Sequence, residues 1–181
     1  QGELVLGKSE ARDGQKILDA HFASGSGSPA FVITPESRQD EAVKTIEANQ
    51  GVSSVSVTAT SSDNGSIPLG KAKEELQKKI KDQVVAKQSA QLDALRSRLN
   101  REMAGLPPAV IDNAFFRATA NIPSAETIAE QAYPFNNVEE KNVDGRVLLQ
   151  ATLSNAPDSL DARETIVQLR DQLKRIDGSI L

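Results

Sequence analysis

The chain has 181 residues, which is enough for one domain with a hydrophobic core. It carries five Phe, one Tyr and no Trp, and its formal net charge is −4, so neither aromatic stacking nor a basic field favours nucleic-acid binding. With no cysteine and a single histidine, disulfides, thiolate catalysis and Cys-based or two-His zinc sites are excluded.

No run of eighteen apolar residues occurs, so we expect no membrane span within these residues. The chain opens at Gln1 rather than at Met, without a secretory signal pattern. We therefore expect it to be a piece of a longer protein, whose export signal, if any, lies outside it.

The first elements alternate between helix and strand. Apolar residues at helical spacing predict a helix over 9–22, which Ser9 is suited to begin. Glycine, serine and proline over 23–29 predict a turn. The compact apolar run 30–34 then predicts a buried strand.

The same alternation continues through the next thirty residues. A helix is predicted over about 38–49, with Gly51 placed to end it. Alternating Val, Ser and Thr predict a strand over 52–60. The segment 61–70, rich in Ser, Gly, Asp and Pro, predicts a break between elements.

Residues 71–104 contain neither Gly nor Pro and predict one long helix of roughly 50 Å. Nine Lys or Arg against five Asp or Glu give this segment a charge of +4. That surface is either a solvated helix face or a basic arm for anionic lipid headgroups or an acidic partner. Val85, Leu92 and Leu99 lie seven residues apart, as in a weak coiled-coil seam, so Leu92 and Leu99 are candidate partner contacts.

Leu106-Pro107-Pro108 is predicted to stop the long helix, and two shorter helices follow. They are expected over 109–119 and over 124–132, the second capped by Ser124. Phe115 and Phe116 are adjacent, so on a helix their side chains diverge by about 100°. Core packing and contact with an apolar cargo or partner are the two interpretations of this pair.

The last part of the chain returns to mixed α/β patterning. Val143-Asp144-Gly145 predicts a tight turn, and 146–154 predicts a strand. A final helix is predicted over about 160–176, ended by Gly178, and Ile180-Leu181 is expected to begin another strand.

The order of these elements predicts an α+β fold with helices packed on one sheet. A split β-α-β, ferredoxin-like body fits this order. We predict that 1–67 and 135–181 are the two halves of the body, and that 68–134 is a long-helix hairpin inserted between them.

No constellation of residues in the sequence predicts catalysis. Gly25-Ser26-Gly27 precedes a strand and lacks the third glycine and the helix of a phosphate-binding loop. His21 is better explained as a residue at a helix end, and Asp63-Asn64-Gly65 lacks the spacing of a calcium loop. The paired carboxylates, such as Glu74-Glu75 and Glu139-Glu140, are explained by solvated faces and helix caps. We therefore expect no enzyme activity, no cofactor and no metal.

Several segments resemble a known family. The stretch from Asp19 to Ala30 (DAHFASGSGSPA) is similar to the helix-turn-strand pattern of the large extracytoplasmic loops of actinobacterial MmpL transporters, members of the RND superfamily; Ala23 stands where that pattern often has proline. Val52-Ser53-Ser54-Val55 looks like the strand entry of the same loops. The stretch from Leu148 to Arg170 is similar to their closing strand, loop and helix. The resemblance covers about 9–62 and 143–181.

The resemblance implies a porter-type domain on the extracytoplasmic side of the cell membrane, in a proton-driven exporter of lipid or other hydrophobic cargo. Its expected partners are the exporter's membrane helices, its second loop domain and the cargo, with possible self-association through the inserted helix and no nucleic acid. A stand-alone secreted or membrane-tethered binding or assembly module is the alternative.

Overall fold

The computed structural model describes residues 28–60 and 65–181 and has a mixed α+β fold. It divides into two compact units, with the division falling inside one helix, after Leu76. The described part of the sheet unit lies within Asp19–Leu76 and Phe135–Leu181, and that of the helical unit is Gln77–Pro134. The predicted helix 9–22, the turn residues 23–27 and His21 lie outside the described residues. Among the helices described, none is both long and apolar enough to cross a bilayer.

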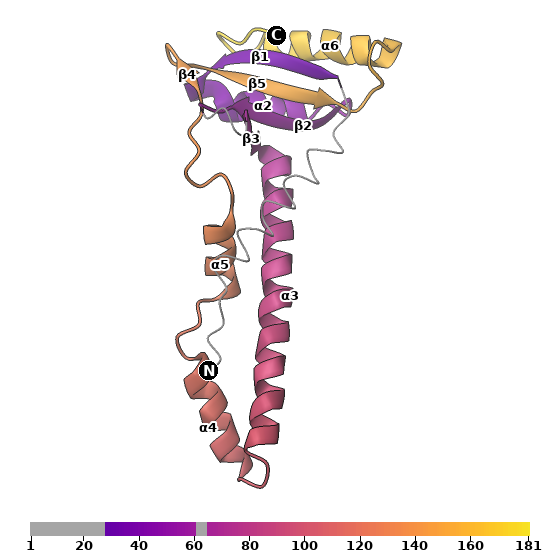
Figure 1. The fold of residues 1–181 in the computed structure, drawn as a ribbon. Coiled ribbons are helices and arrows are strands. Elements are labelled where there is room, and N and C mark those ends of the chain that lie inside the picture. The colour runs from indigo at the N-terminus through magenta and orange to yellow at the C-terminus, as the bar shows by residue number, and fades with distance from the viewer. Residues whose placement is uncertain (1–27, 61–64) are drawn as a thin grey trace. The chain divides into compact units, whose positions relative to one another are not determined.

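The sheet unit contains an antiparallel sheet in the order β1-β5-β2-β3, with β4 also paired to β5 (Figure 1). Every pairing is antiparallel. The strands are β1 (Pro29–Pro35), β2 (Val52–Thr58), β3 (Ser66–Leu69), β4 (Asn142–Val143) and β5 (Arg146–Leu153). The strands expected over 30–34, 52–60 and 146–154 are therefore confirmed.

Helices α2 (Gln39–Glu47) and α6 (Leu160–Leu173) contact each other and pack over the same face of the sheet, with α2 behind the strands in Figure 1. A short 3₁₀ turn, η1 (Glu36–Arg38), leads into α2. Between helices and sheet lies a core from which water is excluded. Its fully buried side chains in this unit include Val32, Ile46, Val55, Val57, Val147, Leu149, Leu169 and Leu173.

The apolar run in β1 is buried on one side only, which corrects the expectation of a fully buried strand. Val32 and Thr34 are completely buried, whereas Phe31 is 51% and Ile33 40% exposed. Successive side chains of a strand point to opposite faces, so the helices cover only every second residue. Phe31 and Ile33 point to the face that α2 and α6 leave uncovered.

The expected break over 61–70 was wrong in its second half, because Ser66–Leu69 forms strand β3. Residues 61–64 lie outside the described residues. Pro68 has no N–H to donate, and proline is disfavoured inside a sheet. Among the described strands, β3 pairs only with β2 and lies at the edge of the sheet, which is where proline is tolerated.

The long helix is confirmed as α3 (Gly70–Glu102), and its first turn is fixed inside the sheet unit. The backbone N–H of Lys71 donates to both carboxylate oxygens of Glu47, at 3.1 Å each. A carboxylate at a helix N-terminus is favourable because N–H groups there lack intrahelical partners. Gly70 has φ +56, and a Cβ on it would overlap the Glu47 carboxylate. Glycine is therefore required where α3 begins.

The helical unit holds the rest of α3 with α4 (Pro108–Thr119) and α5 (Ala125–Ala132). The helix α3 ends at Glu102, before Gly105 (φ +91) and the predicted stop at Leu106-Pro107-Pro108. Pro107 and Pro108 instead begin α4, where proline suits the first turn. Ser124 caps α5 by accepting the Thr127 N–H at 3.2 Å, as the sequence predicts.

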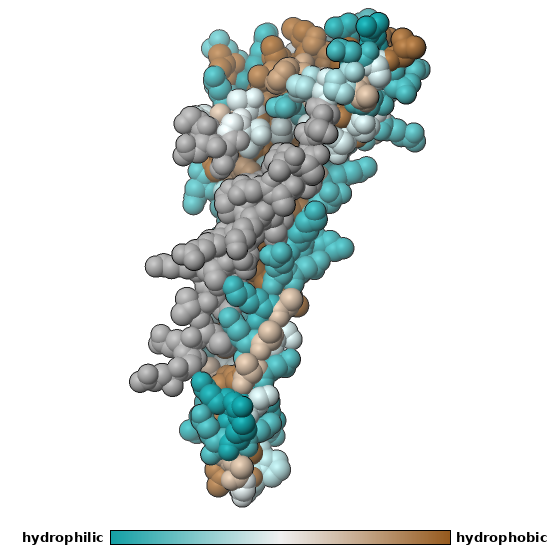
Figure 2. All heavy atoms as spheres, turned by 45° about the vertical axis from the view of Figure 1, so that its right-hand side comes forward, coloured by the Kyte–Doolittle hydropathy of each residue, from teal (hydrophilic) through white to brown (hydrophobic). Residues whose placement is uncertain are grey.

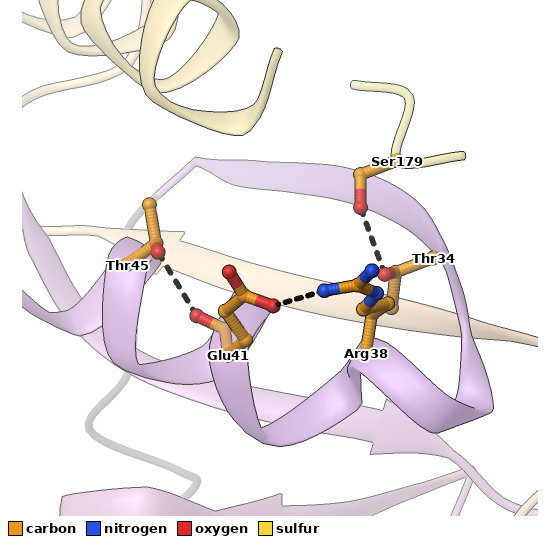
Figure 3. Close-up of polar contacts among 5 residues, drawn as sticks. All are labelled: Thr34, Arg38, Glu41, Thr45 and Ser179. Atoms are coloured by element: carbon orange, nitrogen blue, oxygen red, sulfur yellow. Dashed lines mark hydrogen bonds and ion pairs between the residues drawn. The ribbon is translucent and has the colours of Figure 1, made fainter. Parts of the chain in front are cut away.

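The end of the chain returns to β1. Gly178 has φ +81 and follows the last helical turn, and Ile180 then forms an antiparallel bridge with Ile33 through two backbone hydrogen bonds of 2.8 Å. The hydroxyls of Thr34 and Ser179 lie 2.8 Å apart beside this bridge (Figure 3). The same view shows the ion pair Arg38–Glu41 on the surface of η1 and α2. The strand expected at Ile180 is thus reduced to one bridge.

Candidate functional site

The uncovered face of the sheet carries exposed apolar side chains. Phe31 and Ile33 of β1 pair in register with Gln150 and Leu148 of β5, so all four side chains share this face. We call these four residues the open face. Phe31 and Ile33 are each about half exposed, whereas the opposite face of the same strands is closed by α2 and α6. Apolar side chains at such exposure mark a surface suited to contact.

Strand β2 shares this face of the sheet but adds no exposed group at its centre. Ser56 lies opposite Gln150 in the register of β2 and β5 and is only 8% exposed, while Val55 and Val57 face the helix-covered core. The exposed apolar side chains of this face are therefore those of β1, next to β5.

A hollow of about 570 Å³ lies against the same part of the sheet. Its walls combine apolar side chains with two cations, Lys141 and Arg146, and one carboxylate, Asp144. The residues that line it are Ile33, Thr58, Lys141, Val143, Asp144, Arg146, Val147 and Leu148. All of them belong to the sheet unit.

The β4–β5 hairpin gives this hollow a defined wall. Asp144 (φ 54) and Gly145 (φ 79) both have positive φ, as a two-residue type I′ turn requires, and the tight turn predicted here is confirmed. The Gly145 N–H donates to Asn142 Oδ1, and the Gly145 carbonyl accepts the Glu36 N–H, both at 2.8 Å. Asn142 also donates to the Glu36 carboxylate. The hairpin is thus attached to the end of β1.

The lining of this hollow offers both apolar side chains and charged groups. Among the described residues, no group of three His, Asp or Glu side chains is arranged to hold a metal ion. The groups that line the hollow can contact an apolar body and pair with one or two charges.

A second hollow lies between the α2–β2 loop and α6 and is lined mostly by polar residues. Asn49 Nδ2 donates to Gln168 Oε1 at 3.1 Å, and Thr165 donates to Asn155 Oδ1 at 2.9 Å. These hydrogen bonds join the loop and the β5–α6 connection to α6. Gln172 Oε1, which also lines this hollow, is buried and has no hydrogen-bond partner among the described residues.

The contact residues suggested by the sequence lie in the helical unit, away from the open face in sequence. Phe115 is half-buried and Phe116 is 70% exposed, so the two side chains diverge as expected on a helix. Leu92 and Leu99 are both half-buried on α3. Neither of the two hollows described above is lined by any of these four residues.

Phe115 has a defined neighbour on α3. The Arg96 guanidinium lies 5.1 Å from the centre of the Phe115 ring and pairs with Asp112, one helical turn earlier on α4. A cation over an aromatic face and an ion pair together hold α4 against α3. Phe115 therefore helps to hold α4 against α3, and Phe116 is the exposed member of the pair.

Sequence reasoning missed the open face because β1 is apolar on both sides. A signal was present in β5, where Gln150 and Thr152 alternate with Leu149 and Ala151. That alternation marks one face as partly polar, and antiparallel pairing with β1 would have placed Phe31 on it.

No family model, no curated sequence and no solved structure matches this chain.

Proposed function

We propose that this chain is the extracytoplasmic domain of a proton-driven exporter of the MmpL/RND kind, and that its open face contacts hydrophobic cargo or a neighbouring domain of the same exporter. The family in this proposal is suggested by the sequence resemblance of the segments around β1, β2 and β5–α6. The sheet topology supports it independently of those residues.

The observation that carries the proposal is the interleaving of two β-α-β units. In the first, β1-α2-β2, the strand lying between β1 and β2 is β5. In the second, β5 leads through α6 to Ile180, and the strand between them is β1. Interleaving of this kind defines a split β-α-β sheet, and we propose a ferredoxin-like, porter-type body on this basis.

The open face supplies the physical role. A hydrocarbon chain in water costs about 0.8 kcal/mol per CH₂, so a carrier must cover it during passage. Phe31, Ile33 and Leu148 offer apolar cover on a rigid sheet. A rigid domain can follow movements of attached membrane helices as one body.

The test uses the parent gene expressed in its cell. We expect flanking apolar segments of about twenty residues, and we expect Phe31→Ser with Ile33→Ser to lower export about tenfold at unchanged protein level. The matched control is Leu160→Ser with Val167→Ser, since both of these side chains are exposed on α6 and lie outside the open face. Export equal in both double variants contradicts the role of the open face.

Sidedness is tested in the same cells. These 181 residues contain no cysteine, so Ser97→Cys introduces one label site within them, on the exposed surface of α3, with little change in side-chain size. Cysteines elsewhere in the parent protein are replaced by serine beforehand. A membrane-impermeant maleimide should label it in intact cells. Labelling only after lysis, or a parent protein without membrane spans, contradicts the exporter and favours a stand-alone binding or assembly module.

A further inference from the structure

The turn between α3 and α4 is apolar and exposed. We call residues 103–111 (MAGLPPAVI) the hairpin tip; it contains no charged or hydrogen-bonding side chain. Ala104 through Val110 are all exposed, with Leu106 at 48% and Val110 at 44%. Figure 2 shows apolar atoms on the surface at this end of the α3–α4 hairpin. The tip is a convex apolar surface, and it lies wholly within the helical unit.

Most backbone N–H groups of the hairpin tip form hydrogen bonds within the hairpin. Prolines 107 and 108 have no N–H, and the chain turns at Gly105, which has φ +91. The tip's backbone donors that find an acceptor inside the hairpin are Met103, Ala104, Leu106, Val110 and Ile111. A segment that enters an apolar medium must satisfy its backbone groups internally, and this turn meets most of that requirement.

Charged side chains of both signs flank the tip, and its two adjoining carboxylates, Glu102 and Asp112, pair with Arg98 and Arg96. Arg101 is exposed on the last turn of α3 and Arg117 is exposed on α4, and neither has a carboxylate partner within the part of the chain that the structure describes. Arg98 pairs with Glu102 only at 3.9 Å. An apolar end with arginines next to it is complementary to a bilayer surface, where hydrocarbon lies beneath anionic headgroups.

We propose that the hairpin tip inserts shallowly into the surface of a bilayer that contains anionic lipid. Leu106 and Val110 enter the acyl boundary, and Arg101 and Arg117 pair with phosphates. This inference does not depend on the transport proposal, because it concerns the helical unit and a generic lipid surface.

Two other occupants fit the tip less well. A protein groove would have to fit the shape of the tip and place acidic residues beside both Arg101 and Arg117. A second copy would bring the same unpaired Arg101 and Arg117 toward each other, which is unfavourable by like-charge repulsion. A lipid surface requires neither shape complementarity nor an acidic partner residue.

The first experiment locates the inserted residue. The chain has no Trp, so Leu106→Trp in the whole chain gives a single reporter. With vesicles of phosphatidylcholine and phosphatidylglycerol, its emission should shift to the blue and be quenched by brominated lipid. The control is Val85→Trp, since Val85 is 46% exposed on α3 but outside the tip. No shift at position 106, or an equal shift at 85, overturns the proposal.

The second experiment measures affinity by vesicle sedimentation. Leu106→Gln with Val110→Gln should weaken binding about tenfold or more, while Val85→Gln with Val167→Gln should not. Arg101→Gln with Arg117→Gln should weaken binding to phosphatidylglycerol vesicles more than Lys79→Gln with Lys81→Gln, which removes the same charge from α3 farther from the tip. Circular dichroism of each variant verifies folding, which the exposure of all these side chains favours.

The outcomes separate lipid from protein. Binding that the tip variants lose and the controls keep supports insertion. Binding lost equally from both arginine and lysine pairs indicates a diffuse electrostatic contact along α3 and contradicts insertion. A dimer in sedimentation equilibrium that the Leu106→Gln and Val110→Gln changes abolish, without vesicle binding by the unaltered chain, contradicts the bilayer and identifies a second copy as the occupant.

Discussion

Tyr133, the only tyrosine of the chain, is 9% exposed at the end of α5. Burial raises the pKa of its phenol from 10.0 to about 12, because the charged phenolate loses its hydration in this position. The sequence could not show this, since the burial of Tyr133 depends on tertiary packing.

The raised pKa predicts an alkaline transition of stability. The folded state favours the neutral phenol. The contribution of this phenol to the free energy of unfolding is therefore fully present below the unfolded pKa of about 10, and it is lost as the pH rises through about 12. With one Tyr and no Trp, ultraviolet absorbance follows this phenol directly. We expect titration near pH 12 in the folded chain and near pH 10 in denaturant.

The matched variant is Tyr133→Phe, which keeps the ring and removes the ionisable group. Between pH 10 and 12 its free energy of unfolding should fall less steeply than that of the unaltered chain. A phenol that titrates near pH 10 in the folded protein, or identical slopes for the two proteins, would show that Tyr133 is hydrated.

Gly51 shows how packing between elements differs from local sequence signals. The sequence suggests that it ends a helix, but α2 ends at Glu47 and Gly51 is not among the glycines with positive φ. The physical reason for glycine is instead the approach of α6: a Cβ at position 51 would lie 2.2 Å from Thr165 Oγ1. That distance is well inside van der Waals contact.

Gly51→Ala should therefore destabilise the sheet unit by about 1–3 kcal/mol, as expected for overpacking. Urea unfolding measures the change, with Gln50→Ala, an exposed neighbour, expected to stay within about 0.5 kcal/mol. The cost of Gly51→Ala should be smaller in a Thr165→Ala background, because the clashing hydroxyl and methyl are gone. Equal costs in both backgrounds would refute this contact as the cause.

The elements themselves were predictable where periodicity and caps agreed. The strand over β5, the long helix α3 and the cap at Ser124 follow from alternation, composition and hydrogen-bonding chemistry. The sequence does not predict strand β3, because Pro68 is disfavoured in a central strand and only the sheet order shows that this strand lies at an edge. It does not predict the open face either, because both faces of β1 are apolar. In each case the sequence does not show which element lies next to the strand in the folded sheet.

At the scale of the whole chain, the change from mixed patterning to a long helix and back predicts an insertion over 68–134. The structure divides the chain inside α3, after Leu76, and again after Pro134. The start differs because the first turns of α3 belong to the sheet unit: Glu47 holds the Lys71 N–H, and Leu76 is only 1% exposed. A helix propensity scale shows where a helix begins and carries no information about which core its first turns join.

This division predicts that the sheet unit folds without the helical unit. Deleting Gln77–Pro134 and joining Leu76 to Phe135 through a flexible Gly/Ser linker leaves every strand pairing and the contact of α2 with α6 intact. We expect mixed α/β circular dichroism and a single cooperative urea transition, because a shared core unfolds as one unit. Its helical signal should fall relative to the whole chain, since most of α3 and all of α4 and α5 are absent.

The control for this experiment removes part of the core of the sheet unit. Truncating the same shortened chain after Ser159 deletes α6 and with it Leu169 and Leu173, two of the most buried side chains of the sheet unit. Loss of two such side chains costs several kcal/mol, comparable with the whole stability of a small domain, so this version should unfold. If the linker-joined chain with α6 also lacks a cooperative transition, the helical unit is needed for folding, and the body and its insertion form one folding unit.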